Sequence, residues 1–442
     1  MIMEKLRVIH APRVIHVSND RVGRFLATKA KTLASRSRMF AILTPQSVGL
    51  RPQDAFYAPR AEHFEAANKR LASIDRAVKL RLAEADKALR GHSRDDKLLA
   101  LAMVERELDR ARRAFGMFFE VFAQRGTAHG RALSAHDAIA RDCYTAVRTA
   151  NPKIFAGPLV PPLTYLEHGY SPATMRRGVT LSRLLGESNP FPLIRIPYDR
   201  DQPWQAVFLH EVAHNLQADL GLWVENKNAV MKRLAENHFA PLTITVFARW
   251  HKEIFADLAA LLLGGPASAW GMAEFLAHPQ DKVMTYRPGG PHPTGYFRIF
   301  ILAEMLRRMD FNADARQIAR VWTGLYDLRR GHRLPRVLLE ESKRAIPALV
   351  DEIAFQPRRA LSERNVSTVM PFRPEDQAAI RRGGLLLARG RTPVDLPPRF
   401  MVSAARYAIE SGANQTELNE LLLARLSPGQ PPGAVVTIQK AA

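Results

Sequence analysis

Two long runs of apolar residues at helical spacing, within residues 61–124, constrain the fold of this chain most strongly. In each run an apolar side chain returns every three or four positions, which is the repeat of one helix face. Gly91 separates the runs, and Ser93 with Asp96 forms a capping pattern. The pattern predicts an antiparallel hairpin of two helices that pack along their apolar faces. The two stripes are Phe64, Ala67, Leu71, Ile74, Val78, Leu82, Ala85 and Leu89, then Leu101, Val104, Leu108, Ala111, Phe115, Phe118 and Phe122.

Helical signals also dominate the remainder of the chain, and prolines divide it. A third helix should end near Asn151, a loop-rich region with several prolines covers residues 151–190, and further helices follow Gly331. Alternating apolar residues predict a short strand at 191–197, and a repeated Val-Ile-His over residues 8–16 indicates a small hairpin. We therefore expect a mainly α (α+β) fold with one small sheet.

Three segments follow from this pattern. Residues 1–150 should form a basic N-terminal segment and a helical bundle, and residues 151–330 a central unit with the small sheet. Residues 331–442 should form a helical C-terminal region packed on the central unit, with a frayed tail after Ser427.

Composition limits the class of protein. With 442 residues and 47% hydrophobic content, the chain can bury a large core. Its single cysteine, Cys143, excludes an intramolecular disulfide framework and is typical of a reducing compartment. We find neither a secretory signal nor an uncharged apolar run of about 18 residues, so we expect a cytoplasmic protein without a transmembrane segment.

The net charge of +21 comes mostly from arginine and predicts attraction to polyanions or acidic substrates. The stretch Arg21–Gln53 contains no acidic residue, so it could touch nucleic acid or a membrane surface, or resemble a transit peptide. Glu4 and Asp20 argue against the transit peptide, and an arginine-rich composition can also be a genomic bias. Because no nucleic-acid-binding motif is present, nucleic acid remains a minor alternative partner.

The run His210-Glu211-Val212-Ala213-His214 carries the clearest chemistry. It lies inside a predicted amphipathic helix that begins near Asp201 and stops at Gly221. Residues four apart share one helix face, so His210 and His214 can offer two imidazole nitrogens to one metal ion. Glu211 can then take a proton from a water molecule activated by the metal. The alternative is two partly buried histidines and a glutamate paired with an arginine.

A catalytic zinc site needs a third protein ligand. A histidine six residues after His214 is excluded, since Leu220 occupies that position. Glu253 is the best candidate, because it lies with Asp257 on one face of an apolar predicted helix, where buried carboxylates need partners. Asp257 could accept the free N–H of a ligand histidine and so fix the orientation of its ring.

His210-Glu-x-x-His214 followed by Glu253-x-x-x-Asp257 resembles the gluzincins, the thermolysin-like clan of zinc metallopeptidases. The resemblance covers roughly residues 190–266 and implies a zincin-like catalytic unit. It also implies a small sheet whose edge strand binds extended peptide by strand addition. Pro192–Pro197 could supply that edge, because its two prolines suit an edge strand better than a central one.

Hydrolysis also needs a group that stabilises the developing oxyanion. In gluzincins a histidine or tyrosine beyond the third ligand often provides it, and the Pro/Gly-rich loop of 286–298 is the best region here. We expect His292 and Tyr296 as catalytic candidates and Arg298 as a candidate that binds a substrate carboxylate. His251 precedes Glu253 by two residues and should be structural.

The leading hypothesis is therefore a zinc-dependent metallopeptidase that acts on peptide or protein substrates. One Zn²⁺ per chain would be held by His210, His214 and Glu253, with Glu211 as general base. Two alternatives remain open. One is a basic helical interaction or regulatory protein that binds an acidic partner or nucleic acid without catalysis. The other is a zinc hydrolase of a non-peptide amide.

Overall fold

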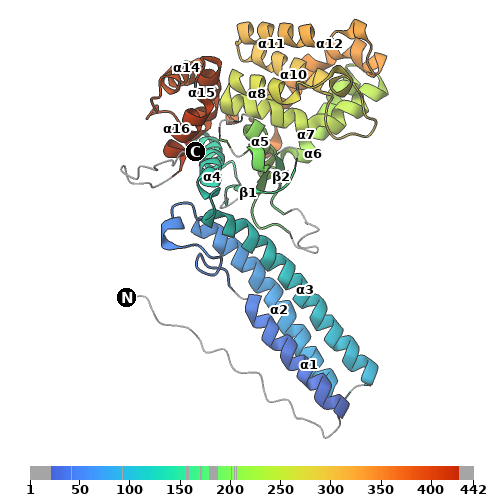
Figure 1. Ribbon diagram of the computed structural model, residues 1–442. Coiled ribbons are helices and arrows are strands. Elements are labelled where there is room, and N and C mark those ends of the chain that lie inside the picture. Colours follow the sequence, from blue (N-terminus) through green and yellow to red (C-terminus); the bar gives the residue numbers. More distant parts are fainter. Residues whose placement is uncertain are drawn as a thin grey trace. The chain divides into compact units, whose positions relative to one another are not determined.

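A computed structural model describes residues 21–40, 42–91, 93–155, 159–169, 172–178, 188–200, 202–203, 205 and 207–427. The hairpin expected over residues 8–16 and the tail after Ser427 lie outside these residues. The helix expected to begin near Asp201 begins later, at Val207, because the described residues 202, 203 and 205 are not helical. The described residues form sixteen α-helices and a single three-stranded sheet (Figure 1). This confirms the mainly α (α+β) fold. Among the described helices, none combines the length and apolarity that a bilayer crossing requires.

The chain divides into two compact units. Of the described residues, those within 21–44 and 64–120 form the first unit, and those within 45–63, 121–178 and 188–427 form the second.

The first unit contains three long helices (Figure 1). Helices α2 (Ala61–Gly91) and α3 (Arg94–Ala123) are the expected pair, and most positions of their apolar stripes are buried. At the turn between them the hydroxyl of Ser93 accepts a hydrogen bond from the backbone N–H of Asp96. Helix α1 (Arg21–Ser37) adds a third helix that buries Leu26 and Leu33, among others. The basic stretch after Arg21 therefore begins as a helix with a buried apolar face.

The second unit contains the remaining helices around one contiguous hydrophobic core. Helix α7 is buried along most of its length, which requires neighbours on several sides. It packs against α5, α6, α8, α10, α12 and α15. The helices of this unit are α4 Gly130–Ala150, α5 Val207–Asp219, α6 Leu222–Glu236, α7 Pro241–Gly264, α8 Pro266–Leu276, α9 Gln280–Val283, α10 Gly295–Arg308, α11 Asn312–Leu325, α12 Arg336–Val350, α13 Val366–Val369, α14 Pro374–Ala388, α15 Pro398–Glu410 and α16 Gln415–Leu426.

The sheet of the second unit contains β1 (Leu163–Leu166), β2 (Ala173–Met175) and β3 (Leu193–Ile196) in the order β1-β3-β2. Strand β3 pairs in parallel with β1 and antiparallel with β2. The expectation that Pro192–Pro197 forms an edge is therefore wrong, because β3 is the central strand. Both prolines flank the strand, so they remove no N–H group from its ladder. The edge beside helix α5 is formed by β2 instead.

Candidate metal centre

Helix α5 presents the two histidines of the His-Glu-x-x-His run on one face. Nearly every residue of α5 is buried, so the helix is fixed from several sides. One helical turn separates His210 from His214, and their ring centroids lie 4.6 Å apart. The helix ends at Asp219, and Gly221 follows with a positive φ of 70° that suits glycine. The helix therefore ends next to Gly221, as the sequence predicts.

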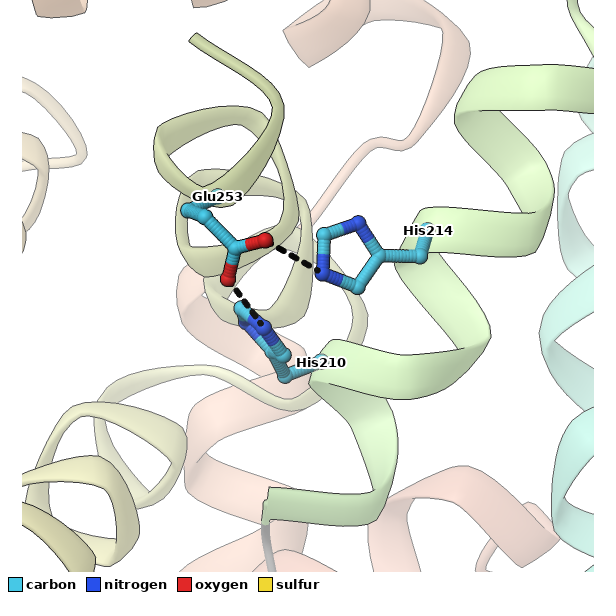
Figure 2. Close-up of side chains that lie close together, drawn as sticks. All are labelled: His210, His214 and Glu253. Atoms are coloured by element: carbon cyan, nitrogen blue, oxygen red, sulfur yellow. Dashed lines mark ion pairs between the residues drawn. The ribbon is translucent and has the colours of Figure 1, made fainter. Parts of the chain in front are cut away.

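Helix α7 brings Glu253 to these two histidines, as Figure 2 shows. Nε2 of His210 lies 3.5 Å from Oε2 of Glu253, and Nε2 of His214 lies 3.5 Å from Oε1. All three ligand atoms lie within 4.8 Å of one another. Two ligands about 2.0–2.1 Å from a tetrahedral zinc ion are separated by about 3.3–3.4 Å. The observed spacing is long for a hydrogen bond but fits donors that share one metal ion.

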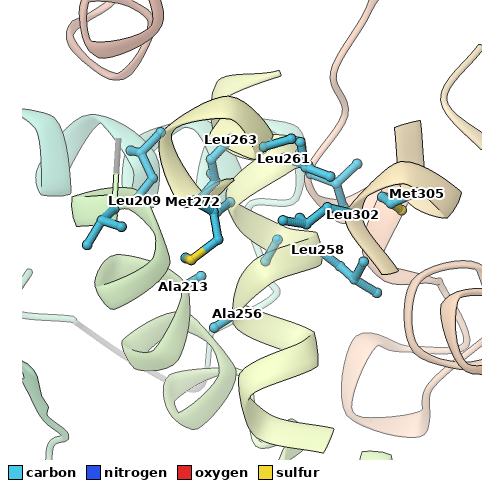
Figure 3. Close-up of a cluster of buried hydrophobic side chains, with 14 of the residues drawn as sticks. Leu209, Ala213, Ala256, Leu258, Leu261, Leu263, Met272, Leu302 and Met305 are labelled. Atoms are coloured by element: carbon cyan, nitrogen blue, oxygen red, sulfur yellow. The ribbon is translucent and has the colours of Figure 1, made fainter. Parts of the chain in front are cut away.

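Apolar packing fixes α5 and α7 relative to each other. Leu209 and Ala213, which directly precede His210 and His214, face the apolar cluster drawn in Figure 3. Side chains of α7, α8 and α10 complete that cluster, among them Leu258, Met272 and Leu302. Because interiors are packed at high density, a small shift of either helix would open voids or create clashes. The spacing of the ligand atoms is therefore set by the core beneath them.

The charges of this group depend on one another. Burial opposes ionisation of Glu253, but the contacts with His210, His214 and His292 outweigh it and hold the pKa of Glu253 well below its usual range. Burial also lowers the pKa of His210, yet the charge of Asp257 and the contacts with Asp257 and Glu253 raise that pKa to about 9 overall. The carboxylates of Glu253 and Asp257 therefore stabilise positive charge at His210, and the same carboxylates would favour a bound cation in its place.

Asp257 and Arg298 support His210 from behind. Oδ1 of Asp257 lies 2.8 Å from Nδ1 of His210, so Nε2 is left facing Glu253. Arg298 donates two hydrogen bonds to Asp257, of 2.8 Å from Nε and 2.6 Å from Nη2. Only 5% of Arg298 is exposed. The expectation that Arg298 binds a substrate carboxylate does not fit this contact, because the guanidinium is buried and its fork is used by Asp257.

Glu211 is held by a residue that the sequence did not single out. The hydroxyl of Thr174, on β2, lies 2.8 Å from both the carbonyl oxygen and Oε2 of Glu211. Only 8% of Glu211 is exposed. Thr174 lies 37 residues before Glu211 in a region expected to be a loop, and a lone threonine there carries no motif. Only the pairing of β2 with β3 and its packing on α5 reveal it.

The other candidates occupy different settings. His292 joins the group, with Nδ1 3.0 Å from Oε2 of Glu253, and 64% of its side chain is exposed. Tyr296 instead packs against Phe297 and Phe300, and among the described residues it makes no hydrogen bond to the group. Burial raises the pKa of Tyr296. His251 is buried with Nδ1 2.7 Å from the carbonyl oxygen of Ala248, in a structural contact.

Comparisons of the chain with protein-family models, with curated proteins and with solved structures found no match. The assignment of a function therefore depends on the residues of the site and their geometry.

Proposed function

We propose that the protein is a zinc-dependent metallopeptidase that hydrolyses peptide bonds. One observation carries this proposal: helices α5 and α7 bring His210, His214 and Glu253 within reach of one ion, beside the buried carboxylate of Glu211. Three protein ligands of this kind leave a fourth position open, as in catalytic rather than structural zinc sites.

The donor set favours zinc among the common metals. Two imidazole nitrogens with one carboxylate oxygen suit Zn²⁺, whereas Mg²⁺ and Ca²⁺ prefer oxygen ligands alone. When bound, Zn²⁺ would acidify a water molecule and polarise the carbonyl group of the substrate.

The protein residues around the ligands have separate tasks. Glu211 accepts a proton from the attacking water and passes it to the leaving amine. Thr174 holds the Glu211 carboxylate by its 2.8 Å hydrogen bond, and Asp257 keeps His210 oriented toward Glu253. The ring of His292 is exposed and lies 3.0 Å from Glu253. It is therefore better placed than Tyr296 to stabilise the oxyanion.

The edge strand supports a peptide as the substrate. In the described sheet β2 has one partner, β3, and its three residues are half-buried. An extended peptide can add to such an edge by backbone hydrogen bonds. Since Thr174 of this strand also touches Glu211, a peptide aligned along β2 would lie next to the general base.

We place the proposed enzyme in the cytoplasm. Its single cysteine, Cys143, is fully buried, which is compatible with a reducing compartment. Burial also raises the pKa of the Cys143 thiol, so this residue is an inert part of the core.

Metal content tests the proposal directly. Protein purified without chelators, and measured by elemental mass spectrometry, should contain about one zinc per chain. His214→Ala should lose this zinc, because one of the three ligands is removed. His332→Ala, which changes an exposed histidine outside the group, should retain it. If the wild type holds no zinc even after reconstitution, the enzyme proposal fails and a basic binding protein becomes the better explanation.

A further inference from the structure

Arg176 lies directly after strand β2 and stacks on an aromatic ring. Its guanidinium carbon is 3.8 Å from the ring centroid of Trp223, on α6. The ammonium group of Lys252, on α7, is 5.5 Å from the same centroid. We call these three residues the Trp223 cluster. It holds two cations against one half-buried indole.

Two chain connections link the Trp223 cluster to the elements that form the candidate metal centre. Thr174 has its side chain on Glu211, and only Met175 separates it from Arg176 in the chain. The second connection is through Trp223, whose ring centroid lies 5.7 Å from that of His251 in an edge-to-face contact. His251 and Lys252 immediately precede the ligand Glu253.

The cations of this cluster have no carboxylate partner among the described residues. Two other arginines of this region do have carboxylate partners: Arg177 lies 3.6 Å from Asp219, and Arg195 lies 3.9 Å from Glu167. Burial lowers the pKa of Arg176, and no carboxylate in the described part of the chain counters it. A partly buried charge is normally paired. An unpaired cation on the elements of a candidate reaction centre is therefore a candidate to bind a ligand of opposite charge.

Stacking on Trp223 leaves the binding edge of Arg176 available. A guanidinium stacks through its flat face, while its N–H donors point outward in the plane. The stack thus holds Arg176 in one orientation without using the donors that bind a carboxylate bidentately. A purely structural cation–π contact would explain the stack, but it would not explain why two cations meet there without an acid.

We infer that Arg176, supported by Lys252, forms a subsite for a carboxylate of the substrate. The carboxylate would be an acidic side chain near the scissile bond or the C-terminal carboxylate of a peptide. This inference rests on the proposed peptidase function and adds the substrate class to it. The net charge of +21 agrees with an acidic substrate, because it attracts such a molecule from a distance.

Paired peptides test the subsite. In a set of alanine-rich peptides, glutamate is placed at each position in turn, and each peptide has a counterpart with glutamine at that position. Every peptide is made once with a free C-terminus and once with an amidated C-terminus. Zinc-loaded wild type should cleave the glutamate peptide about tenfold faster than its glutamine counterpart at one position. Alternatively, it should cleave peptides with a free C-terminus faster than amidated ones by a similar factor. In Arg176→Gln this preference should disappear while the uncharged peptides are cleaved within about twofold of wild type. Arg316→Gln, a change of an exposed arginine on α11, should retain the preference.

The position of the preference distinguishes the two sources of the carboxylate. An effect of glutamate assigns the subsite to a side chain, and an effect of the free terminus assigns it to the C-terminal carboxylate. Equal preference in wild type and Arg176→Gln would overturn the inference, as would an equal loss of charged and uncharged substrates.

Binding measurements separate this inference from the proposed function. The same peptides are titrated into zinc-loaded Glu211→Gln protein with Arg176 intact or replaced by glutamine. If no peptide is cleaved by the wild type but charged peptides bind more tightly only when Arg176 is present, the subsite stands and the peptidase proposal fails. If charge has no effect on binding, or no peptide binds, the subsite is refuted.

Discussion

Glu211→Gln is expected to reduce peptide hydrolysis by about 10³-fold and to leave zinc binding intact. The amide has nearly the shape of the carboxylate but cannot accept the proton of the attacking water. Glu211 does not belong to the group of His210, His214 and Glu253 that can hold the metal, so the ligands are unchanged. Turnover of a cleaved library peptide and zinc content should be measured on the same preparation.

The fold should tolerate this substitution. The hydroxyl of Thr174 now lies 2.8 Å from a carboxylate oxygen of Glu211, and it can donate equally to an amide oxygen. Thermal melting should therefore stay close to that of the wild type. Glu236→Gln, at an exposed position of α6, serves as the matched control and should keep full activity. Full activity in Glu211→Gln would show that the assigned mechanism is wrong.

The sequence predicted those parts of the site that depend on helix geometry. Residues four apart on a helix share a face regardless of the rest of the fold, so His210 and His214 could be paired from the chain alone. The same rule placed Glu253 and Asp257 on one face of α7. The long apolar stripes of α2 and α3 were likewise evident, since a 3.6-residue repeat is a local signal.

The remaining parts depend on contacts between distant segments. Thr174 reaches Glu211 only because β2 pairs with β3 and packs on α5, and no sequence pattern records that pairing. Prolines at both ends of β3 suggested an edge strand, but they lie just outside the paired residues. Arg298 was recognisable as a charged residue near the site, yet its partner Asp257 lies 41 residues away on another helix. Such tertiary pairings set the role of a side chain without leaving a periodic signal.

Removing the Asp257 carboxylate should destabilise the protein more than any surface substitution. Asp257 is 1% exposed and lies between Arg298 and His210. Burial opposes its charge, but Arg298 and His210 outweigh that effect and lower the pKa of Asp257. In Asp257→Ala the guanidinium of Arg298 would remain buried without its partner, at a cost of about 3–5 kcal/mol in the free energy of unfolding. Urea unfolding in the presence of a chelator should measure this loss without a contribution from the metal.

Zinc affinity should depend on the contact between Asp257 and His210 rather than on the pair of Asp257 with Arg298. Without Asp257, Nδ1 of His210 loses its partner at 2.8 Å, and zinc affinity should fall by about 10–100-fold. The double variant Asp257→Ala/Arg298→Met removes the unpaired charge as well, so most of the stability should return. Its zinc affinity, measured by competition with a chromophoric chelator, should stay low because His210 is still not held in place. If affinity recovered together with stability, Asp257 would act on the metal only through the fold, and its direct role in orienting His210 would be refuted.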